Sequence, residues 1–279
     1  MIHRFRIGAM QAVVISDGPL ILPAPSELFS GPAPEAVASL LREGGLPTDC
    51  VEQNCLLLET DGHRVLFDNG LGSAKLYGPD SGRLLESLAE AGVDPASIDT
   101  LVLTHAHSDH CWGTMGDDGT PNFPNAAIVM AQAELNFWTS APPGAGRRSA
   151  AGVRTHLVPL RARIRFVGDG AEVLPGVQAW STPGHTPGHM AYLLDGGDGA
   201  RWCLSGDVML HHPLSFAFPE AECQFDTDRA LGAATRRRVL DRLAADRLAV
   251  IGYHQPWPGL GRVERAGTAF RFIPDGGDT

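Results

Sequence analysis

The chain has 279 residues, of which 43% are hydrophobic and 19% charged, so it is long enough to bury a full core. Its 22 basic and 32 acidic residues give a formal net charge of −10, and no Lys/Arg-rich tract is present that would neutralise a nucleic-acid backbone or bind an acidic membrane. No apolar run approaches the ~18 residues that span a bilayer, and the first residues alternate like a strand, which predicts a cytoplasmic protein that binds neither membrane nor nucleic acid.

The first third of the chain is predicted to contain mainly strands. Residues 5–18 have the pattern of a strand, and residues 54–70 form two further strands joined by a tight turn at Asp61-Gly62. The intervening residues 19–34 are rich in Pro, Gly and Ser, which is typical of a long loop or lid.

Helices and strands alternate from there to the end of the chain. Residues 81–94 have helical spacing, and residues 98–104 are an apolar run typical of a strand that is buried on both faces. The further predicted segments are a strand leading into a helix at 126–138, strands at 177–184, 190–196 and 200–207, a long helix from Asp226 to Asp246 and a strand at 248–254. No linker or repeat divides the chain, so we predict one α/β domain that spans residues 1–279.

The cysteines carry no sign of a structural framework. Their number is odd, and no two are spaced as CxxC, which argues against both a set of disulfides and a structural zinc site. We expect most of them to be small buried hydrophobic residues. The five are Cys50, Cys55, Cys111, Cys203 and Cys223.

The densest chemical signal follows the apolar run 98–104, in the stretch THAHSDHCWG. It places three of the 11 histidines of the chain and one aspartate within six positions, as His105, His107, Asp109 and His110. One pair of these side chains lies at a strand end and the other in the next turn, so the two pairs can point at two adjacent places in space. We therefore predict a metal centre rather than the alternative, a polar solvated turn.

Four further candidate ligands sit at predicted strand ends, where loops expose functional groups. His185 and His189 lie in STPGHTPGH, Asp207 in CLSGDVML and His254 in VIGYHQPWPG. A single histidine at a strand end is more often a structural residue than a ligand. Four such positions after the histidine-rich stretch favour the functional interpretation.

Together, HAHSDH, TPGHTPGH, SGD and a late histidine resemble the metallo-β-lactamase superfamily over nearly the whole chain. The resemblance implies a four-layer αββα sandwich with a dinuclear metal centre at one edge. It implies that His105, His107 and His185 hold the first metal, that Asp109, His110 and His254 hold the second, and that Asp207 bridges the two. It also implies a supporting role beneath the ligand loop for Asp68, which is followed by Asn69 in place of the commoner Thr, and we expect His189 to support the ligands as well.

These residue types suit hydrolysis. Two cations held by neutral imidazoles and a shared carboxylate lower the pKa of a water between them from 15.7 to about 7, which supplies hydroxide as a nucleophile. We expect Asp207 to act as the bridge and Asp109 to relay a proton to the leaving group. Zinc is the expected metal, although manganese, iron and cobalt suit the same donors.

Several branches of the superfamily fit less well than others. His107 stands where flavodiiron reductases have Glu, RNA-processing relatives would need a basic surface, and the glutathione-binding segment of glyoxalase II is not found. Arg236, Arg237 and Arg238 are predicted to form a solvated helix face instead. The flanks, residues 123–138 and 253–274, are similar to the branch of methyl parathion hydrolase, lactonases and aryl esterases. Leu210 stands where the better-known lactonases have Tyr, which leaves Tyr253 as a nearby tyrosine in sequence.

The substrate pocket is predicted from aromatic and apolar residues near the metal motifs, with core packing as the alternative for each. The candidates are Trp112, Trp138, Leu210, Phe216, Phe218 and Trp257. His211 and His212 are expected to support the ligands or lie at the surface. The predicted function is a hydrolase that uses a metal-bridging hydroxide to open lactones or cleave carboxylic esters of small molecules with an apolar part, with a homodimer as the assembly considered. The alternatives are an organophosphate triesterase, a β-lactamase and a non-catalytic metal sensor.

Overall fold

Two seven-stranded sheets form the centre of the molecule in the computed structural model, which describes residues 1–44, 49–140, 147–197 and 199–275. The first sheet has the order β1 (Ile2–Ile7), β2 (Met10–Ser16), β6 (Asn54–Thr60), β7 (His63–Phe67), β8 (Thr100–Val102), β9 (Ala127–Ala131) and β10 (Ile164–Val167). The second has the order β11 (Glu172–Leu174), β12 (Val177–Ser181), β13 (Met190–Asp195), β14 (Arg201–Leu204), β16 (Ala249–Ile251), β17 (Leu260–Ala266) and β18 (Ala269–Pro274).

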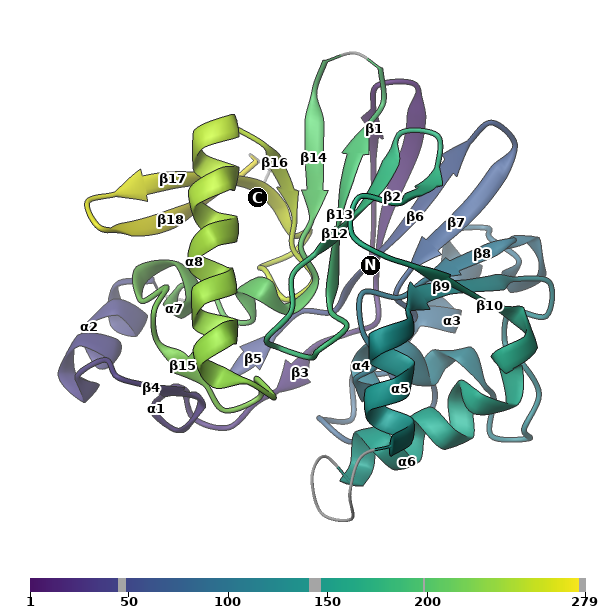
Figure 1. Ribbon diagram of the computed structural model, residues 1–279, viewed down its shortest axis with the longest axis horizontal. Helices are drawn as coiled ribbons and strands as arrows, with labels where there is room; N and C mark the ends of the chain where they lie inside the picture. Colours follow the sequence, from purple (N-terminus) through teal and green to yellow (C-terminus); the bar gives the residue numbers. More distant parts are fainter. Residues whose placement is uncertain (45–48, 141–146, 198, 276–279) are drawn as a thin grey trace.

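Helices cover the outer face of each sheet, so the layers are stacked as helix, sheet, sheet and helix (Figure 1). The first sheet packs on α3 (Leu84–Glu90), α5 (Gln132–Ser140) and α6 (Arg147–His156), and the second packs on α8 (Arg229–Asp246). This is the predicted αββα sandwich. No helix among the described residues is long and apolar enough to cross a membrane.

Alternating side chains in the central strands explain why both faces of each sheet are covered. In β6, Leu56 and Leu58 join the core between the two sheets, whereas Leu57 joins the core beneath the helices. In β8, Val102 faces the other sheet and Leu101 faces the helices. Because successive side chains of a strand point to opposite faces, a continuous apolar run needs a partner layer on each side.

The N-terminal third differs from its prediction in one segment. The turn at Asp61-Gly62 is present, with φ of 48° and 80°. Residues 19–34, predicted as a loop, contain short elements instead, and prolines begin two helices there because proline suits the first helical turn. The elements around this segment are β3 (Leu20–Ile21), α1 (Pro25–Leu28), β4 (Phe29–Ser30), α2 (Pro34–Gly44) and β5 (Cys50–Val51).

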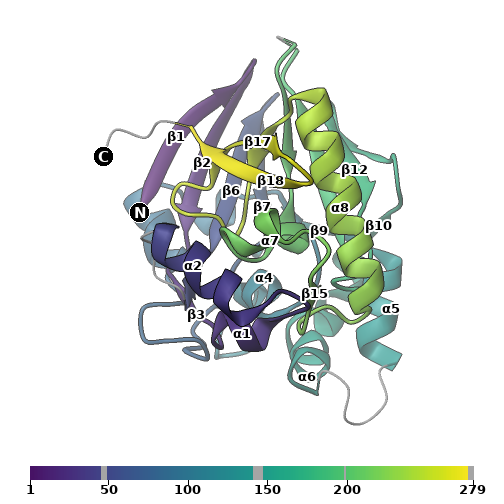
Figure 2. The ribbon, with the colours of Figure 1, turned by 90° about the vertical axis from the view of Figure 1, so that its left-hand side faces the viewer.

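Short elements also connect the metal motifs. They are η1 (Pro95–Ser97), α4 (Ser108–Cys111), η2 (Trp112–Thr114), η3 (Val158–Arg163), η4 (Gly206–Met209), α7 (Leu214–Ala217) and β15 (Glu222–Cys223). Both views place α1, α2, β15 and α6 at the same end of the two sheets (Figures 1 and 2). Four of the five cysteines are buried, Cys50 is partly exposed, and all are free thiols.

Candidate metal centre

The direction of the strands brings the predicted ligands together. Strands β7, β8 and β9 run parallel, and β12, β14 and β16 share one direction because β13 is antiparallel to both β12 and β14. The carboxyl ends of strands are where α/β folds place their binding sites. The residues that follow these ends are Asp68 after β7, the stretch 104–111 after β8, His185 after β12, Asp207 after β14 and His254 after β16.

The first group of ligand atoms consists of three imidazoles and one carboxylate. His107 Nδ1 lies 3.0 Å from His105 Nε2 and 2.9 Å from His185 Nε2. Asp207 Oδ2 lies 3.2 Å from His185 Nε2 and 3.8 Å from His105 Nε2. Their ligand-type atoms all lie within 4.8 Å of one another, as one metal ion requires.

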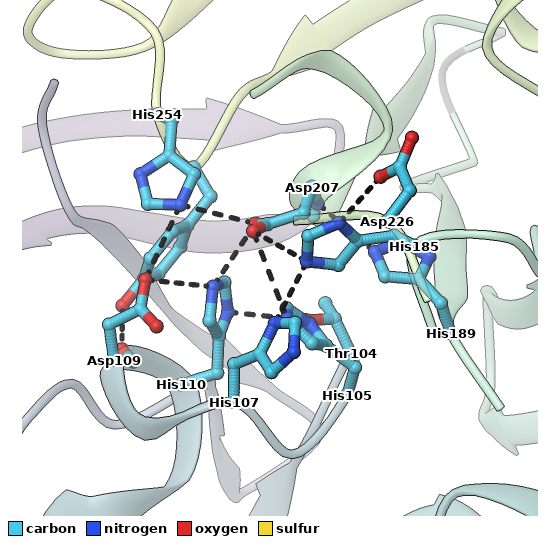
Figure 3. A network of polar contacts seen from close by, with 12 residues as sticks. Thr104, His105, His107, Asp109, His110, His185, His189, Asp207, Asp226 and His254 are labelled. Atoms are coloured by element: carbon cyan, nitrogen blue, oxygen red, sulfur yellow. Dashed lines mark hydrogen bonds and ion pairs between the residues drawn. The ribbon is translucent and has the colours of Figure 1, made fainter. Parts of the chain in front are cut away.

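The second group lies beside the first and shares Asp207 with it. Asp207 Oδ1 lies 3.1 Å from His110 Nε2 and 3.3 Å from His254 Nε2. Asp109 Oδ2 lies 3.4 Å from each of the same two nitrogens. The two oxygens of Asp207 therefore face different groups, which is the arrangement expected of a bridge (Figure 3).

Unpaired buried atoms test whether these residues fit metal ions. Among the described residues, His110 Nε2, His254 Nε2 and Asp207 Oδ1 are buried and make no hydrogen bond, although they lie within 3.1 to 3.4 Å of one another or of Asp109 Oδ2, and this is costly unless another group satisfies them. Burial, together with the neighbouring His185, also lowers the pKa of His107 to about 3, so this imidazole is neutral and its nitrogen is free to donate a lone pair. The donor set therefore fits two divalent cations.

Most of the ligand imidazoles are held through the ring nitrogen that faces away from the group. The Nδ1 contacts are His105 with Thr104 Oγ1 at 3.0 Å, His110 with Asp68 Oδ2 at 2.8 Å, His185 with Asp226 Oδ1 at 2.9 Å and His254 with the Glu52 carbonyl at 2.7 Å. Such contacts fix the orientation and the tautomer of a ligating histidine. Figure 3 shows the four rings arranged around Asp207.

Asp68 and His189 lie where support for the ligands was predicted. Asp68 has a left-handed φ of 56°, and its carboxylate accepts hydrogen bonds from the Thr104 amide and hydroxyl, each at 2.8 Å, as well as from His110. Burial and the neighbouring His185 lower the pKa of His189 to about 3. The neutral His189 ring contacts Thr182 Oγ1 through Nδ1, and its Nε2 accepts the amide N–H of Asp207 at 3.0 Å, which orients the shared carboxylate.

Comparison with known proteins identifies the family. Residues 48–249 match the profile of the Metallo-beta-lactamase superfamily. The chain belongs to this superfamily. An N-acyl homoserine lactonase of Bacillus sp is 26% identical over 204 residues, which cover 65% of this chain and 73% of the relative.

Two solved structures match the metallo-β-lactamase fold of this chain from end to end. One is AidC, a dizinc quorum-quenching lactonase in complex with a product N-hexanoyl-L-homoserine, with a TM-score of 0.93 and 23% identity over 100% of this chain and 98% of that one. The other is the hydrolase AbOPH, with a TM-score of 0.89, 25% identity and the same coverage. The predicted superfamily and fold are confirmed.

A cavity of about 890 Å³ opens above the metal centre of this metallo-β-lactamase fold. Of the predicted pocket residues, Trp138 and Leu210 line it. The apolar and aromatic lining that sequence reasoning missed consists of Leu20, Leu22, Tyr77, Phe137 and Phe225, and Arg148 and Arg229 add charge. Phe137 is the neighbour of the predicted Trp138, and Leu20 and Leu22 lie in the segment predicted as a loop or lid, whereas no local signal marks Tyr77 or Phe225.

The other predicted pocket residues are not among the residues that line this cavity. The Trp112 ring stacks on His156 with centroids 5.2 Å apart, and Phe216 is buried against Phe272 beneath α8. Trp257 packs against the core between the sheets. Phe218 lines a different cavity, of about 540 Å³, beside α8.

His211 and His212 also lie outside the lining of the main cavity. The His211 ring packs edge-on against Phe29, and the His212 ring lies against Phe216 and Phe272. Tyr253, considered from its position beside His254, is buried, and its hydroxyl donates to the carbonyl of Asp109. Of the three tyrosines in the chain, Tyr77 is therefore the one that lines the cavity.

Arg236 corrects the prediction of a solvated arginine face. Its guanidinium is buried and donates to the carbonyls of Val208, Pro219 and Ala221 and to Asp226 Oδ2. Since the other oxygen of Asp226 accepts from His185, the arginine backs a carboxylate that holds a ligand. Arg237 and Arg238 lie on the same helix with more exposure, as predicted.

Proposed function

We propose that this chain is a dinuclear metal-dependent lactonase that opens N-acyl homoserine lactones. The observation that carries the proposal is the pair of buried ligand groups that share Asp207 at the floor of a cavity with apolar walls. The names of the relatives support the choice of substrate, since N-acyl homoserine lactonases are among the similar sequences and a lactonase with its product is among the similar structures.

Divalent metals, when bound by these donors, would make hydroxide available at neutral pH and would stabilise the negative charge that develops on a carbonyl oxygen. We propose zinc for both positions, because imidazole and carboxylate suit it and a similar structure is a dizinc enzyme. We also propose a cytoplasmic location, which the free thiols of the five cysteines favour.

The chain itself supplies the geometry and the proton transfer. Asp207, oriented by His189, keeps the two ligand groups at a fixed separation. Asp109 lines the cavity, so its carboxylate is placed to take the proton released when water attacks the lactone carbonyl. Delivery of that proton to the ring oxygen, as its bond to the carbonyl carbon breaks, leaves an alcohol and a carboxylic acid, and the acid releases its own proton to solvent at neutral pH.

The cavity favours a substrate with an apolar chain. Its volume lies in the upper part of the roughly 300–1,000 Å³ range of small-molecule sites, and Leu20, Leu22 and Phe137 supply apolar surface beyond the metal groups. Each buried methylene contributes about 0.8 kcal/mol, so we expect KM to fall as the acyl chain lengthens until this surface is covered.

The proposal is tested by acid release from the zinc-reconstituted protein on matched substrates. The panel is an N-acyl homoserine lactone, an aryl ester, an aryl phosphotriester and a β-lactam. We expect the lactone to be preferred by ~100-fold or more in kcat/KM, equivalent to about 2.7 kcal/mol of differential transition-state binding. Preference for the phosphotriester would assign the chain to the alternative chemistry.

Two variants separate site-dependent activity from contamination. His254→Ala removes a second-group ligand and should abolish turnover, whereas His63→Ala removes an exposed histidine at the start of β7 and should leave it unchanged. Protein that binds two zinc ions and hydrolyses none of the four substrates would instead be a metal sensor.

A further inference from the structure

Glu134 is a fully buried carboxylate at the third position of α5, next to the metal centre without belonging to it. Its neighbours Leu135 and Trp138 belong to the apolar core beneath the first sheet. A buried carboxylate is costly unless hydrogen bonds compensate for the lost water. Glu134 is therefore a residue whose presence needs a reason.

Its hydrogen bonds supply that reason. Oε1 accepts the backbone N–H of Ala106 at 2.9 Å and the indole N–H of Trp138 at 2.7 Å. Oε2 accepts the backbone N–H of Gly188 at 3.0 Å. Ala106 lies between His105 and His107, and Gly188 lies in the turn that carries His185, so one carboxylate joins two loops that are some 80 positions apart in sequence.

Close packing at Gly188 shows how tightly the second loop is pressed on the helix. A Cβ at this position would lie 2.3 Å from the backbone nitrogen of Glu134 and 2.5 Å from its Cβ. These distances are too short for any residue other than glycine at position 188. The Trp138 ring, held by the same carboxylate, lies 5.4 Å from the His107 ring. The hydrogen bonds of Glu134 described above thus all lead to the first ligand group.

The second ligand group has different supports. Asp68 holds His110, and the Glu52 carbonyl holds His254. None of the hydrogen bonds of Glu134 described above reaches the residues that carry the second group. A change at Glu134 should therefore lower the metal affinity of the first position and leave that of the second position nearly unchanged.

We propose that Glu134 is a positioning residue that sets the metal affinity of the first position, His105, His107, His185 and Asp207, by joining the two loops that carry its histidines. The ionised carboxylate matters because N–H donors converge on both of its oxygens. In Glu134→Gln one oxygen becomes an NH₂ group that faces a donor, so one loop loses its attachment. The inference rests on the two metal positions of the proposed function.

The experiment measures zinc binding in place of turnover. Glu134→Gln is made in His254→Ala, which leaves the first group whole, and in His107→Ala, which leaves the second group usable. Zinc affinity is measured by competition with a chromophoric chelator. We expect the substitution to weaken zinc about 10- to 100-fold in the His254→Ala background, the usual effect of removing an outer partner of a ligand, and by less than about twofold in the His107→Ala background.

Two further variants control for folding and for the chemical change itself. Leu135→Ala opens the core beside Glu134 without removing a hydrogen bond to either loop. It should lower the melting temperature and change zinc affinity to the same extent in the two backgrounds. Glu90→Gln makes the same chemical change at an exposed position at the end of α3 and should change nothing.

Equal weakening of zinc in both backgrounds, or a pattern like that of Leu135→Ala, would overturn the inference, as would unchanged affinity in the His254→Ala background. Failure of the proposed function has a different signature. In that case the protein without substitutions would bind fewer than two zinc ions, or would bind two and not open lactones.

Discussion

The two halves of the metal centre are supported in different ways. In the first half the supports are buried carboxylates. Glu134 joins the two loops, and Asp226, which accepts from Arg236, holds His185. In the second half the supports are mixed, because the buried Asp68 carboxylate holds His110, a main-chain carbonyl holds His254 and a tyrosine hydroxyl donates to the Asp109 carbonyl. The support of His254 should therefore be the hardest to remove by substitution, because a main-chain carbonyl remains when a side chain is replaced.

Asp207→Asn should have the largest effect, because it removes the one element that both halves share. One amide group cannot serve as an anionic ligand to two cations, so both metals should weaken together. We expect kcat/KM to fall by about 10³-fold, or roughly 4 kcal/mol of transition-state stabilisation. Metal analysis after dialysis checks the coupling, and loss of one metal alone would show that Asp207 does not bridge.

Asp68→Asn should have the next largest effect, and it should weaken metal binding in both halves. Asp68 contacts His110 directly and reaches His105 through the Thr104 hydroxyl. Asparagine tolerates the left-handed backbone at this position, so the substitution isolates the hydrogen bonds. We expect zinc to weaken by about 10- to 100-fold at the second position and by less at the first. An effect confined to the first position would contradict the geometry.

Asp226→Asn should weaken the first position alone. Its amide nitrogen would have to face either the His185 N–H or the Arg236 guanidinium, both of which are donors. About tenfold weaker zinc binding is expected, measured by chelator competition. Asp228→Asn is the matched control, since Asp228 caps α8 and asparagine caps a helix as well as aspartate does. Equal effects of the two variants would count against the assignment.

Tyr253→Phe should have the smallest effect, and it belongs to the second half. The hydroxyl that donates to the Asp109 carbonyl is lost, while the ring can remain against His110, whose centroid is 4.0 Å away. We expect a loss of about 1 kcal/mol in the free energy of unfolding and less than about fivefold in kcat/KM. Urea unfolding and steady-state kinetics measure the two quantities, and a loss of all metal would show that the hydroxyl does more than its hydrogen bond to Asp109 explains.

The candidate metal ligands could be picked out from sequence because each lies in a loop or short helix that follows a strand, and short motifs at such places keep their local geometry. The supports could not, because Glu134 and Asp226 act across the fold. Arg236 shows most clearly what sequence alone does not reveal. The three successive arginines look alike in sequence, but Arg236 is buried and the other two are more exposed. Trp112 does not line the cavity, because nearness in sequence to the candidate ligands does not decide which way a ring points.

The wall of the cavity has one further consequence, which concerns how the protein can change over evolutionary time. Leu20 and Leu22 lie outside residues 48–249, the part that matches the superfamily, and Phe225 follows β15, which pairs with β4 in a two-stranded sheet separate from both large sheets. Part of the cavity wall is thus built by chain segments separate from the strand ends that carry the candidate metal ligands. Insertions and exchanges in these segments can alter selectivity while the chemistry is inherited unchanged.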